Sequence, residues 1–348
     1  MNTRRVRRVL TTVRRQAGML IFFVTAVGGL SRTEAEAVNW TEILSPAGSP
    51  SARCCVGLAF DVAHRSHLLF GGADGSGNPL GDTWQLRNGQ WIQVFPVNGV
   101  SPSARQGPGM VYDRATNTVL LFGGTNGTTN FDDTWIWDGT TATWTELFPP
   151  KKPPGRRFDT QGMTFDVEHG RVVLFGGYAA GAVFNDTWIW DGKTRLWTQR
   201  FPKVSPSARR APIAYDRATE KIVLFGGDDG AANQYNDTWI WNGTNWQQPA
   251  TPVAPGPRGL ASLAYDPTLH GVVLTAGFIN TQVYNDTWIW NGNAWNQITT
   301  TNVPTYGRFA FGIDYDPIAH GPLIFGGFST GFALSDTWVL APLPDDDE

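Results

Sequence analysis

The 348-residue sequence is poor in cysteine, in charge and in long helical patterns. Its only two cysteines, Cys54 and Cys55, are adjacent, so they cannot supply the spaced disulfides that staple many secreted folds. The sequence leaves open whether they form a reduced pair or a vicinal disulfide. Charged residues make up 16% of the chain and the net charge is -3, without a basic stripe. We therefore expect no nucleic-acid partner, and a fold held together by burial.

The amino terminus differs from the rest of the chain. Residues 1–16 contain six arginines and no acid, residues 17–30 are mostly apolar, and Ala35-Glu36-Ala37 offers a small-x-small cleavage site. This layout is typical of a secretory signal peptide, and the apolar run is shorter than the ~20 residues that span a bilayer. We interpret residues 1–37 as a signal peptide, with an uncleaved anchor as the alternative. The protein is then expected to be periplasmic or extracellular, without membrane insertion after cleavage.

One tripeptide returns at regular intervals along the remaining chain. Asp-Thr-Trp occurs six times, beginning at positions 82, 133, 186, 237, 286 and 336, with steps of 51, 53, 51, 49 and 50 residues. A period of this length indicates a repeat architecture. Abundant glycine, proline and tryptophan favour short strands and tight turns.

Each repeat contains four predicted strands. An arginine precedes a first strand that ends in an aromatic residue and Asp, as in Tyr112-Asp113, and a short polar turn follows. The second strand ends in Gly123-Gly124, a variable loop leads to the Asp-Thr-Trp strand, and a tight turn delivers a fourth strand marked by Trp144. Four antiparallel strands per ~50 residues make one blade of a β-propeller.

The ends of the chain predict how the ring closes. The sixth repeat lacks a fourth-strand tryptophan, whereas Trp40-Thr41-Glu42 near the amino terminus matches Trp144-Thr145-Glu146. We therefore predict an all-β, six-bladed propeller over residues 38–341, with the amino-terminal strand completing the last blade and removing exposed sheet edges. All 16 tryptophans occupy repeat positions, so we assign them to packing between blades. Residues 342–348 are interpreted as a solvated acidic tail.

These motifs resemble the kelch repeat. The resemblance rests on the paired glycines, on a late aromatic in the third strand such as Trp137 or Trp190, and on a tryptophan five or seven residues later. It implies a binding platform, because most kelch propellers bind other molecules and only a minority, such as galactose-oxidase-like copper oxidases, are enzymes. A copper oxidase would need a Tyr-linked Cys and two His at the channel mouth, and Cys54 and Cys55 have no such neighbours. No cofactor or metal is expected.

The two ends of the predicted ring differ in their connections. Those between strands 2 and 3 and between strands 4 and 1 share one end, here called the loop face, and they are long or variable. The short turns lie at the other end, here called the turn face. Variable loops on a rigid scaffold are common binding sites, so we predict that the loop face is functional. The four loop residues proposed to bind there are Asp74, Asn126, Asp228 and Asp229.

The first-strand arginines are predicted to surround the channel mouth on the loop face. Two interpretations stay open: the ring reads anions, or each arginine pairs with the Asp of its own Asp-Thr-Trp motif. Four of the five histidines fall in turns of different blades at the turn face, so they cannot meet on one metal. The six arginines are Arg53, Arg105, Arg157, Arg209, Arg258 and Arg308.

The sequence therefore predicts an exported, monomeric, non-catalytic kelch-like propeller that binds a protein or a glycan. The alternative is a secreted carbohydrate-active enzyme whose channel-mouth site combines the arginine ring with Asp74, Asp228 and Asp229. A structural envelope protein without a ligand is a third interpretation.

Overall fold

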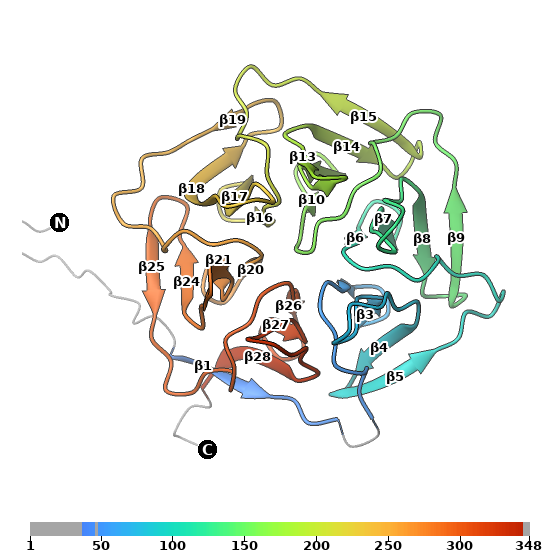
Figure 1. The fold of residues 1–348 in the computed structure, drawn as a ribbon, viewed down its shortest axis with the longest axis horizontal. Helices are drawn as coiled ribbons and strands as arrows, with labels where there is room; N and C mark the ends of the chain where they lie inside the picture. Colours follow the sequence, from blue (N-terminus) through green and yellow to red (C-terminus); the bar gives the residue numbers. More distant parts are fainter. Residues whose placement is uncertain (1–36, 46–47, 344–348) are drawn as a thin grey trace, which may run out of the picture. The chain divides into compact units, whose positions relative to one another are not determined.

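The computed structural model describes residues 37–45 and 48–343. These residues form six antiparallel four-stranded sheets that lie side by side around a central channel (Figure 1). The described part contains no helix long and apolar enough to cross a membrane. The predicted signal peptide and the acidic tail lie almost wholly outside the described residues.

The blades follow one another in chain order, and the first strand of each is innermost. Blade 1 contains β2 (Gly57–Asp61), β3 (Ser66–Phe70), β4 (Thr83–Arg87) and β5 (Gln90–Val94). Blade 2 contains β6 (Gly109–Asp113), β7 (Thr118–Phe122), β8 (Thr134–Asp138) and β9 (Thr143–Leu147). Blade 3 contains β10 (Met163–Asp166), β11 (Arg171–Phe175), β14 (Thr187–Asp191) and β15 (Leu196–Arg200).

The second half of the ring repeats this order. Blade 4 contains β16 (Ile213–Asp216), β17 (Lys221–Asp228), β18 (Gln234–Trp241) and β19 (Trp246–Gln247). Blade 5 contains β20 (Ser262–Asp266), β21 (Gly271–Thr275), β24 (Thr287–Trp290) and β25 (Trp295–Ile298). Blade 6 contains β26 (Gly312–Asp316), β27 (Gly321–Phe325), β28 (Thr337–Pro342) and β1 (Val38–Glu42). Two loop hairpins add β12 (Tyr178–Ala179) with β13 (Ala182–Val183), and β22 (Phe278–Ile279) with β23 (Gln282–Val283).

The ring closes as predicted, because the amino-terminal strand completes blade 6. Strand β1 pairs antiparallel with β28, with Trp40 opposite Leu340 and Glu42 opposite Trp338 (Figure 1). Trp40 is buried and donates its indole N–H to Thr287 Oγ1 of blade 5 at 3.1 Å. The two ends of the propeller domain are thus joined within one sheet, and no blade is left with an unpaired fourth position.

Each residue of the Asp-Thr-Trp motif has a separate structural role. In blade 2, Asp133 Oδ2 accepts a hydrogen bond from Trp135 Nε1 at 2.8 Å. Thr134 Oγ1 accepts one from Trp197 Nε1 of blade 3 at 3.1 Å, and the Trp197 ring packs edge-on against Phe122 with centroids 5.3 Å apart. The same indole-to-threonine bond joins all six neighbouring pairs of blades at 2.9–3.1 Å. The predicted role of tryptophan in packing between blades is therefore confirmed for the six fourth-strand tryptophans.

Blade 3 departs from the others by sending a segment across the channel. Asp166 lies ten positions after Arg156, whereas Asp113 lies eight positions after Arg105 in blade 2. The additional chain lets Thr160 Oγ1 donate to Ala261 O of blade 5 at 2.5 Å. Further along, Gln161 Nε2 donates to Ile313 O of blade 6, which lies opposite blade 3, and Gln161 O accepts from Ile213 N of blade 4 at 2.8 Å. We call residues 159–162 the plug.

We expect replacement of Trp40 to loosen the closure of the ring. The Trp40→Ala variant loses a fully buried indole and its bond to Thr287, so it should be destabilised by about 3–5 kcal/mol in urea unfolding. Leu44→Ala, just beyond the same strand at a side chain that is 75% exposed, is the matched control and should change stability little. Equal stability of the two variants would contradict the proposed closure.

Candidate functional site at the channel mouth

The first-strand arginines pair with the aspartates of the Asp-Thr-Trp motifs, as one of the two interpretations predicted. Arg105 Nη1 lies 2.6 Å from Asp133 Oδ1 and Nη2 lies 2.8 Å from Oδ2, a bidentate pair, while Nη1 also donates to Gly123 O at 2.8 Å. Gly123 has a φ of +71°, and a Cβ there would lie 2.5 Å from the backbone of Arg156 in the next blade. The paired glycines are therefore needed for close approach of neighbouring blades.

The pairing recurs in every blade and corrects one predicted residue. Arg53, Arg105, Arg209, Arg258 and Arg308 are buried and pair with the aspartates of their own blades. In blade 3 the partner of Asp186 is Arg156, at 2.5 Å, and not the predicted Arg157. The backbone explains the difference, because Arg156 N donates to Phe131 O of the preceding blade, as Arg105 N donates to Leu80 O. Direct ligand binding by the buried arginines stays a prediction.

Three of these ion pairs lower the pKa of their aspartates. Burial would raise the pKa of Asp286, but the hydrogen bond and charge of Arg258 and the indole N–H of Trp288 outweigh burial and lower that pKa. The same balance lowers the pKa of Asp82 and of Asp336. A carboxylate with a lowered folded pKa stabilises the fold at neutral pH.

Three of the four predicted loop residues hold their own loops in shape. Asp74 Oδ1 accepts from the backbone N–H groups of Ser76 and Asn78, both at 2.9 Å. Asn126 Oδ1 accepts from Thr128 N and Thr129 N, and Asp229 Oδ1 accepts from Ala231 N and Asn233 N. Asn126 is exposed, Asp74 and Asp229 are half-buried, and all three cap equivalent turns. Their binding role is untested and stays a prediction.

The fourth loop residue, Asp228, belongs to a ring of residues around the channel mouth. In each blade, the residue after the paired arginine forms a β-bridge with the residue after the second-strand glycines. These bridges bring together two residues per blade at the loop-face end of the channel. The channel mouth consists of Cys54 and Ala73, Gln106 and Thr125, Arg157 and Tyr178, Arg210 and Asp228, Gly259 and Phe278, and Phe309 and Phe328.

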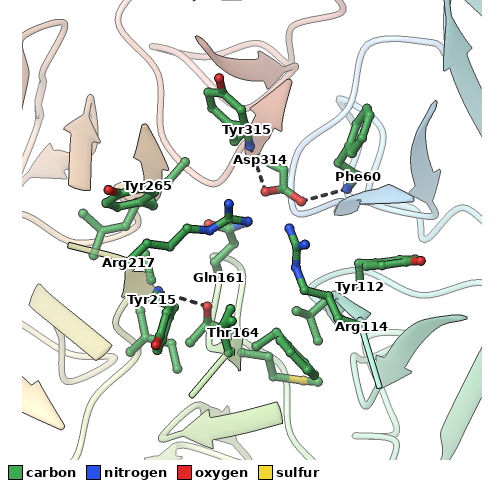
Figure 2. A pocket seen from close by; sticks show the side chains of 18 of the residues that line it. Phe60, Tyr112, Arg114, Gln161, Thr164, Tyr215, Arg217, Tyr265, Asp314 and Tyr315 are labelled. Atoms are coloured by element: carbon green, nitrogen blue, oxygen red, sulfur yellow. Dashed lines mark hydrogen bonds between the residues drawn. The ribbon is translucent and has the colours of Figure 1, made fainter. Parts of the chain in front are cut away.

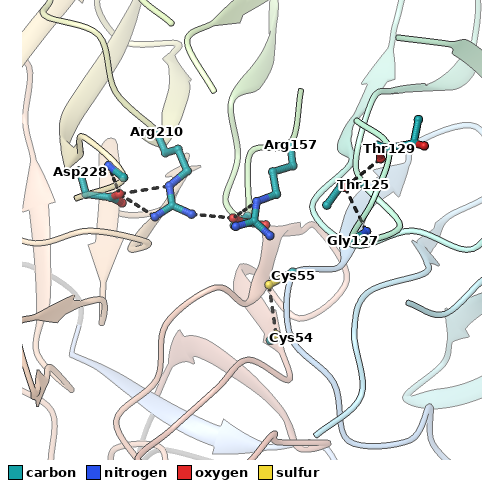
Figure 3. A network of polar contacts seen from close by, with 10 residues as sticks. Cys54, Cys55, Thr125, Gly127, Thr129, Arg157, Arg210 and Asp228 are labelled. Carbon is teal, nitrogen blue, oxygen red and sulfur yellow. Dashed lines mark hydrogen bonds and ion pairs between the residues drawn. The ribbon is translucent and has the colours of Figure 1, made fainter. Parts of the chain in front are cut away.

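One side of the channel mouth is charged. Arg210 lies between two carboxylates, with Nη1 2.7 Å from Asp159 Oδ2 and Nη2 2.6 Å from Asp228 Oδ1 (Figure 3). Asp159, from the plug, also lies 3.2 Å from Arg157 Nε. Burial raises the pKa of Asp228, and the negative charge of Asp159 adds to this effect against the opposing charge of Arg210. The four groups form one chain of alternating charge.

Arg157 differs from the other predicted arginines because its donors are available. Its guanidinium stands over the Tyr178 ring, 5.1 Å from the centroid, and its side chain is 27% exposed. No described residue forms a hydrogen bond to either Nη atom of Arg157. Because Arg156 makes the structural pair, Arg157 is left to face the channel mouth.

The opposite side of the channel mouth is aromatic. Phe309 lies between Phe278 and Phe328, with ring centroids 5.0 and 5.7 Å apart, and all three rings are partly exposed. Cys54 and Cys55 continue this apolar side as free thiols with sulfurs 3.1 Å apart. The hydrogen bond between them lowers the pKa of Cys54 and raises that of Cys55. The channel mouth therefore presents a cation beside an aromatic surface.

Sequence reasoning missed Asp159, Arg210 and the aromatic trio. Two signals were available. One is the doubled arginines Arg156-Arg157 and Arg209-Arg210, and the other is the changed spacing of their repeats, because the turn Asp lies ten positions after the paired arginine in blade 3 and seven positions after it in blade 4. The residues that take no part in the repeated scaffold contacts are therefore found where the sequence departs from the repeat.

Comparison with known families agrees with this geometry. A family model described as the KLHDC2/KLHL20/DRC7 Kelch-repeats domain matches residues 29–210, just over half of the chain. The chain belongs to the kelch-repeat family. The fold is the six-bladed kelch propeller, which is commonly a protein-binding module.

Individual relatives are distant and longer. The chain is similar to the flagellar outer-arm dynein alpha chain of Chlamydomonas reinhardtii (26% identity) and to an F-box/kelch-repeat protein of Arabidopsis thaliana (28%). It is also similar to tip elongation aberrant protein 1 of Schizosaccharomyces pombe (27%). The matches cover 56%, 58% and 52% of this chain, but only 5%, 45% and 17% of the respective relatives. The chain thus matches less than half of the length of each.

The buried, paired Arg105 and the partly exposed Arg157 allow a direct test of how each contributes to stability. Arg105→Ala leaves Asp133 buried without its partner, so it should lose about 3–5 kcal/mol of unfolding free energy. Arg157→Ala, the matched control on the same face, removes a partly exposed arginine and should lose less than about 1 kcal/mol. Chemical unfolding of both variants checks the assignment, and a larger loss for Arg157→Ala would reverse it.

The lowered pKa of Asp286 predicts a pH dependence with a defined sign. Asp286→Asn should be less stable than wild type at pH 7, because the charged pair with Arg258 is lost. The stability difference should shrink as pH falls below about 4, the ordinary pKa of Asp in the unfolded chain, and should be lost once pH falls through the lower pKa of folded Asp286. Unfolding of both proteins between pH 7 and pH 3 measures the difference, and a constant gap would contradict the charged pair.

Proposed function

We propose that this kelch propeller is an exported, non-catalytic binding module that holds a segment of a partner protein across its channel mouth. The observation that carries the proposal is Arg157, whose guanidinium has unpaired donors beside Tyr178 and faces the same mouth as the aromatic trio. Export rests on the signal-peptide pattern of residues 1–37.

The chemistry of the channel mouth favours a particular kind of segment. The planar fork of Arg157 suits a carboxylate, which it can receive with two parallel hydrogen bonds. Partly exposed Phe278, Phe309 and Phe328 suit an apolar or aromatic side chain of the partner. A segment with an acidic residue close to an aromatic one satisfies both sides. A neutral glycan would leave the charged side unused, so we favour a protein over a glycan.

The surrounding loops add surface and rigidity. Phe95, Phe148 and Phe201 follow the fourth strands of blades 1 to 3 and are 75%, 82% and 80% exposed, which places apolar side chains in the connections that lead to the loop face. The caps formed by Asp74 and Asp229 hold two of the loops in one conformation, which lowers the entropy lost on binding. Asp74 and Asp229 are engaged in hydrogen bonds within their own loops. The alternative of a carbohydrate-active enzyme, which relied on these acids, therefore gains no support.

Peptide selection tests the proposal with matched variants. Purified protein is used to select from a random dodecapeptide display library, and selected peptides are measured by biolayer interferometry. We expect peptides that combine acidic and aromatic residues. Their affinity should fall at least about tenfold, or 1.4 kcal/mol, for Arg157→Glu and for Phe309→Ala. Arg87→Glu, an exposed arginine at the end of β4, is the charge-matched control and should bind normally.

Two results would contradict the proposed function. One is peptide binding that is equally strong in Arg157→Glu and Arg87→Glu, which would place the site elsewhere. The other is a glycan-array signal that depends on Arg157 while no peptide is selected, which would assign the channel mouth to glycans.

A further inference from the structure

A second site lies in the channel on the other side of the plug. A cavity of about 220 Å³ occupies the turn-face end of the channel, enclosed by the ends of the innermost strands. Gln161 of the plug lines its inner end, and side chains from several blades point into it (Figure 2). This volume is below the ~300 Å³ of the smaller ligand pockets, so it fits only a compact molecule.

The polar residues of this cavity are departures from the repeat. The residue after each turn-capping Asp is Val62, Arg114, Val167, Arg217, Pro267 or Pro317, in blade order. The residue before each turn-flanking aromatic is Ala59, Val111, Thr164, Ala214, Ala264 or Asp314. Valine, proline and alanine satisfy the fold at these positions in most blades. The arginines of blades 2 and 4 and the aspartate of blade 6 are therefore not required by the propeller.

Arg114 and Arg217 point toward the channel axis without partners. Both side chains are exposed to the cavity, and neither forms a hydrogen bond or an ion pair with any residue that the structure describes (Figure 2). Burial lowers the pKa of Arg114 and the positive charge of Arg217 lowers it further, against the opposing negative charge of Asp314. Two cations that face each other in a confined space repel, which an anion between them would relieve.

Asp314 does not neutralise this pair. Its carboxylate accepts hydrogen bonds from the backbone N–H groups of Phe60 at 2.7 Å and of Tyr315 at 2.8 Å, which fix it to the wall of the cavity. Burial raises its pKa, while the hydrogen bond from Phe60 N and the positive charge of Arg114 oppose this effect. One carboxylate against two guanidinium groups leaves an excess of positive charge, which selects an anionic ligand.

The remaining wall is largely apolar. Met110, Met163, Ile213 and Leu263 line the cavity together with Tyr112 and Tyr215. Such a wall suits a short hydrocarbon or aromatic body more than a fully hydrated inorganic ion. We propose that this cavity binds a small organic carboxylate, whose oxygens lie between Arg114 and Arg217 and whose apolar part contacts the methionines and aliphatic side chains.

This site is independent of the function proposed for the loop face. Gln161 is held across the channel by its bonds to Ile213 N and Ile313 O, so the plug stands between the two ends. A ligand at the turn face therefore contacts none of the residues of the channel mouth.

Calorimetry with defined probes tests the assignment. Benzoate, succinate and inorganic phosphate are titrated into wild type, Arg114→Gln, Arg217→Gln and the double variant. Arg87→Gln, with the same change in charge outside the cavity, is the control. We expect a carboxylate to bind wild type and the control alike, each single variant to lose at least about tenfold in affinity, and the double variant to show no binding. Asp314→Asn should bind more tightly, because it removes a negative charge.

Unfolding measurements without ligand check that a loss of binding does not come from a loss of stability. Arg114→Gln and Arg217→Gln should unfold no earlier than Arg87→Gln, because they remove a repulsion and no contact. The proposal is overturned if neither carboxylate binds wild type, if phosphate alone binds, or if the cavity variants bind as well as the control. Weaker carboxylate binding by a folded Asp314→Asn would also overturn it.

Discussion

The propeller depends on one repeated contact, the hydrogen bond from a fourth-strand tryptophan to the threonine of the preceding blade. The six indoles are buried, five of them against a phenylalanine of that blade, so the bond forms where water is excluded and an unpaired N–H would be costly. The same motif uses its aspartate to receive an arginine and its own tryptophan. Because each blade supplies a donor to one neighbour and an acceptor to the other, closing the ring satisfies the donor and the acceptor of every blade. This explains why Trp40 must return to blade 6.

Most residues of the repeat are needed for packing. Candidate binding residues are therefore found where a blade departs from the repeat. Five of the six predicted arginines are buried in the scaffold, and the sixth, Arg157, is available because Arg156 takes its structural place. At the opposite end, Arg114 and Arg217 stand where other blades have valine or proline. Position within the repeat therefore separates the arginines that are paired within the scaffold from those that are available to a ligand better than residue type does.

The period, the closure and the arginine pairs could be predicted from sequence because they are local and repeated six times. The position of Arg157 could not, since blade 3 carries two additional residues and only the backbone bond from Arg156 to Phe131 shows which arginine keeps the register. The plug could not be predicted from the sequence either. Thr160 and Ala261 are 101 residues apart in the chain. Their contact occurs once and not in every repeat, so no sequence pattern indicates it.

The plug has a wider consequence for how this kelch propeller can work. An open channel would let charge and water at one end influence the other, whereas a segment bonded to blades 4, 5 and 6 separates them with low-dielectric protein. Asp159, at the start of the plug, completes the charged side of the channel mouth, while Gln161, two residues later, lines the turn-face cavity. A single irregular stretch of blade 3 thus builds part of both sites and keeps them apart. The rigid ring makes this arrangement stable, because Thr160 and Gln161 bond to backbone carbonyls and N–H groups that are already fixed in blades 4, 5 and 6.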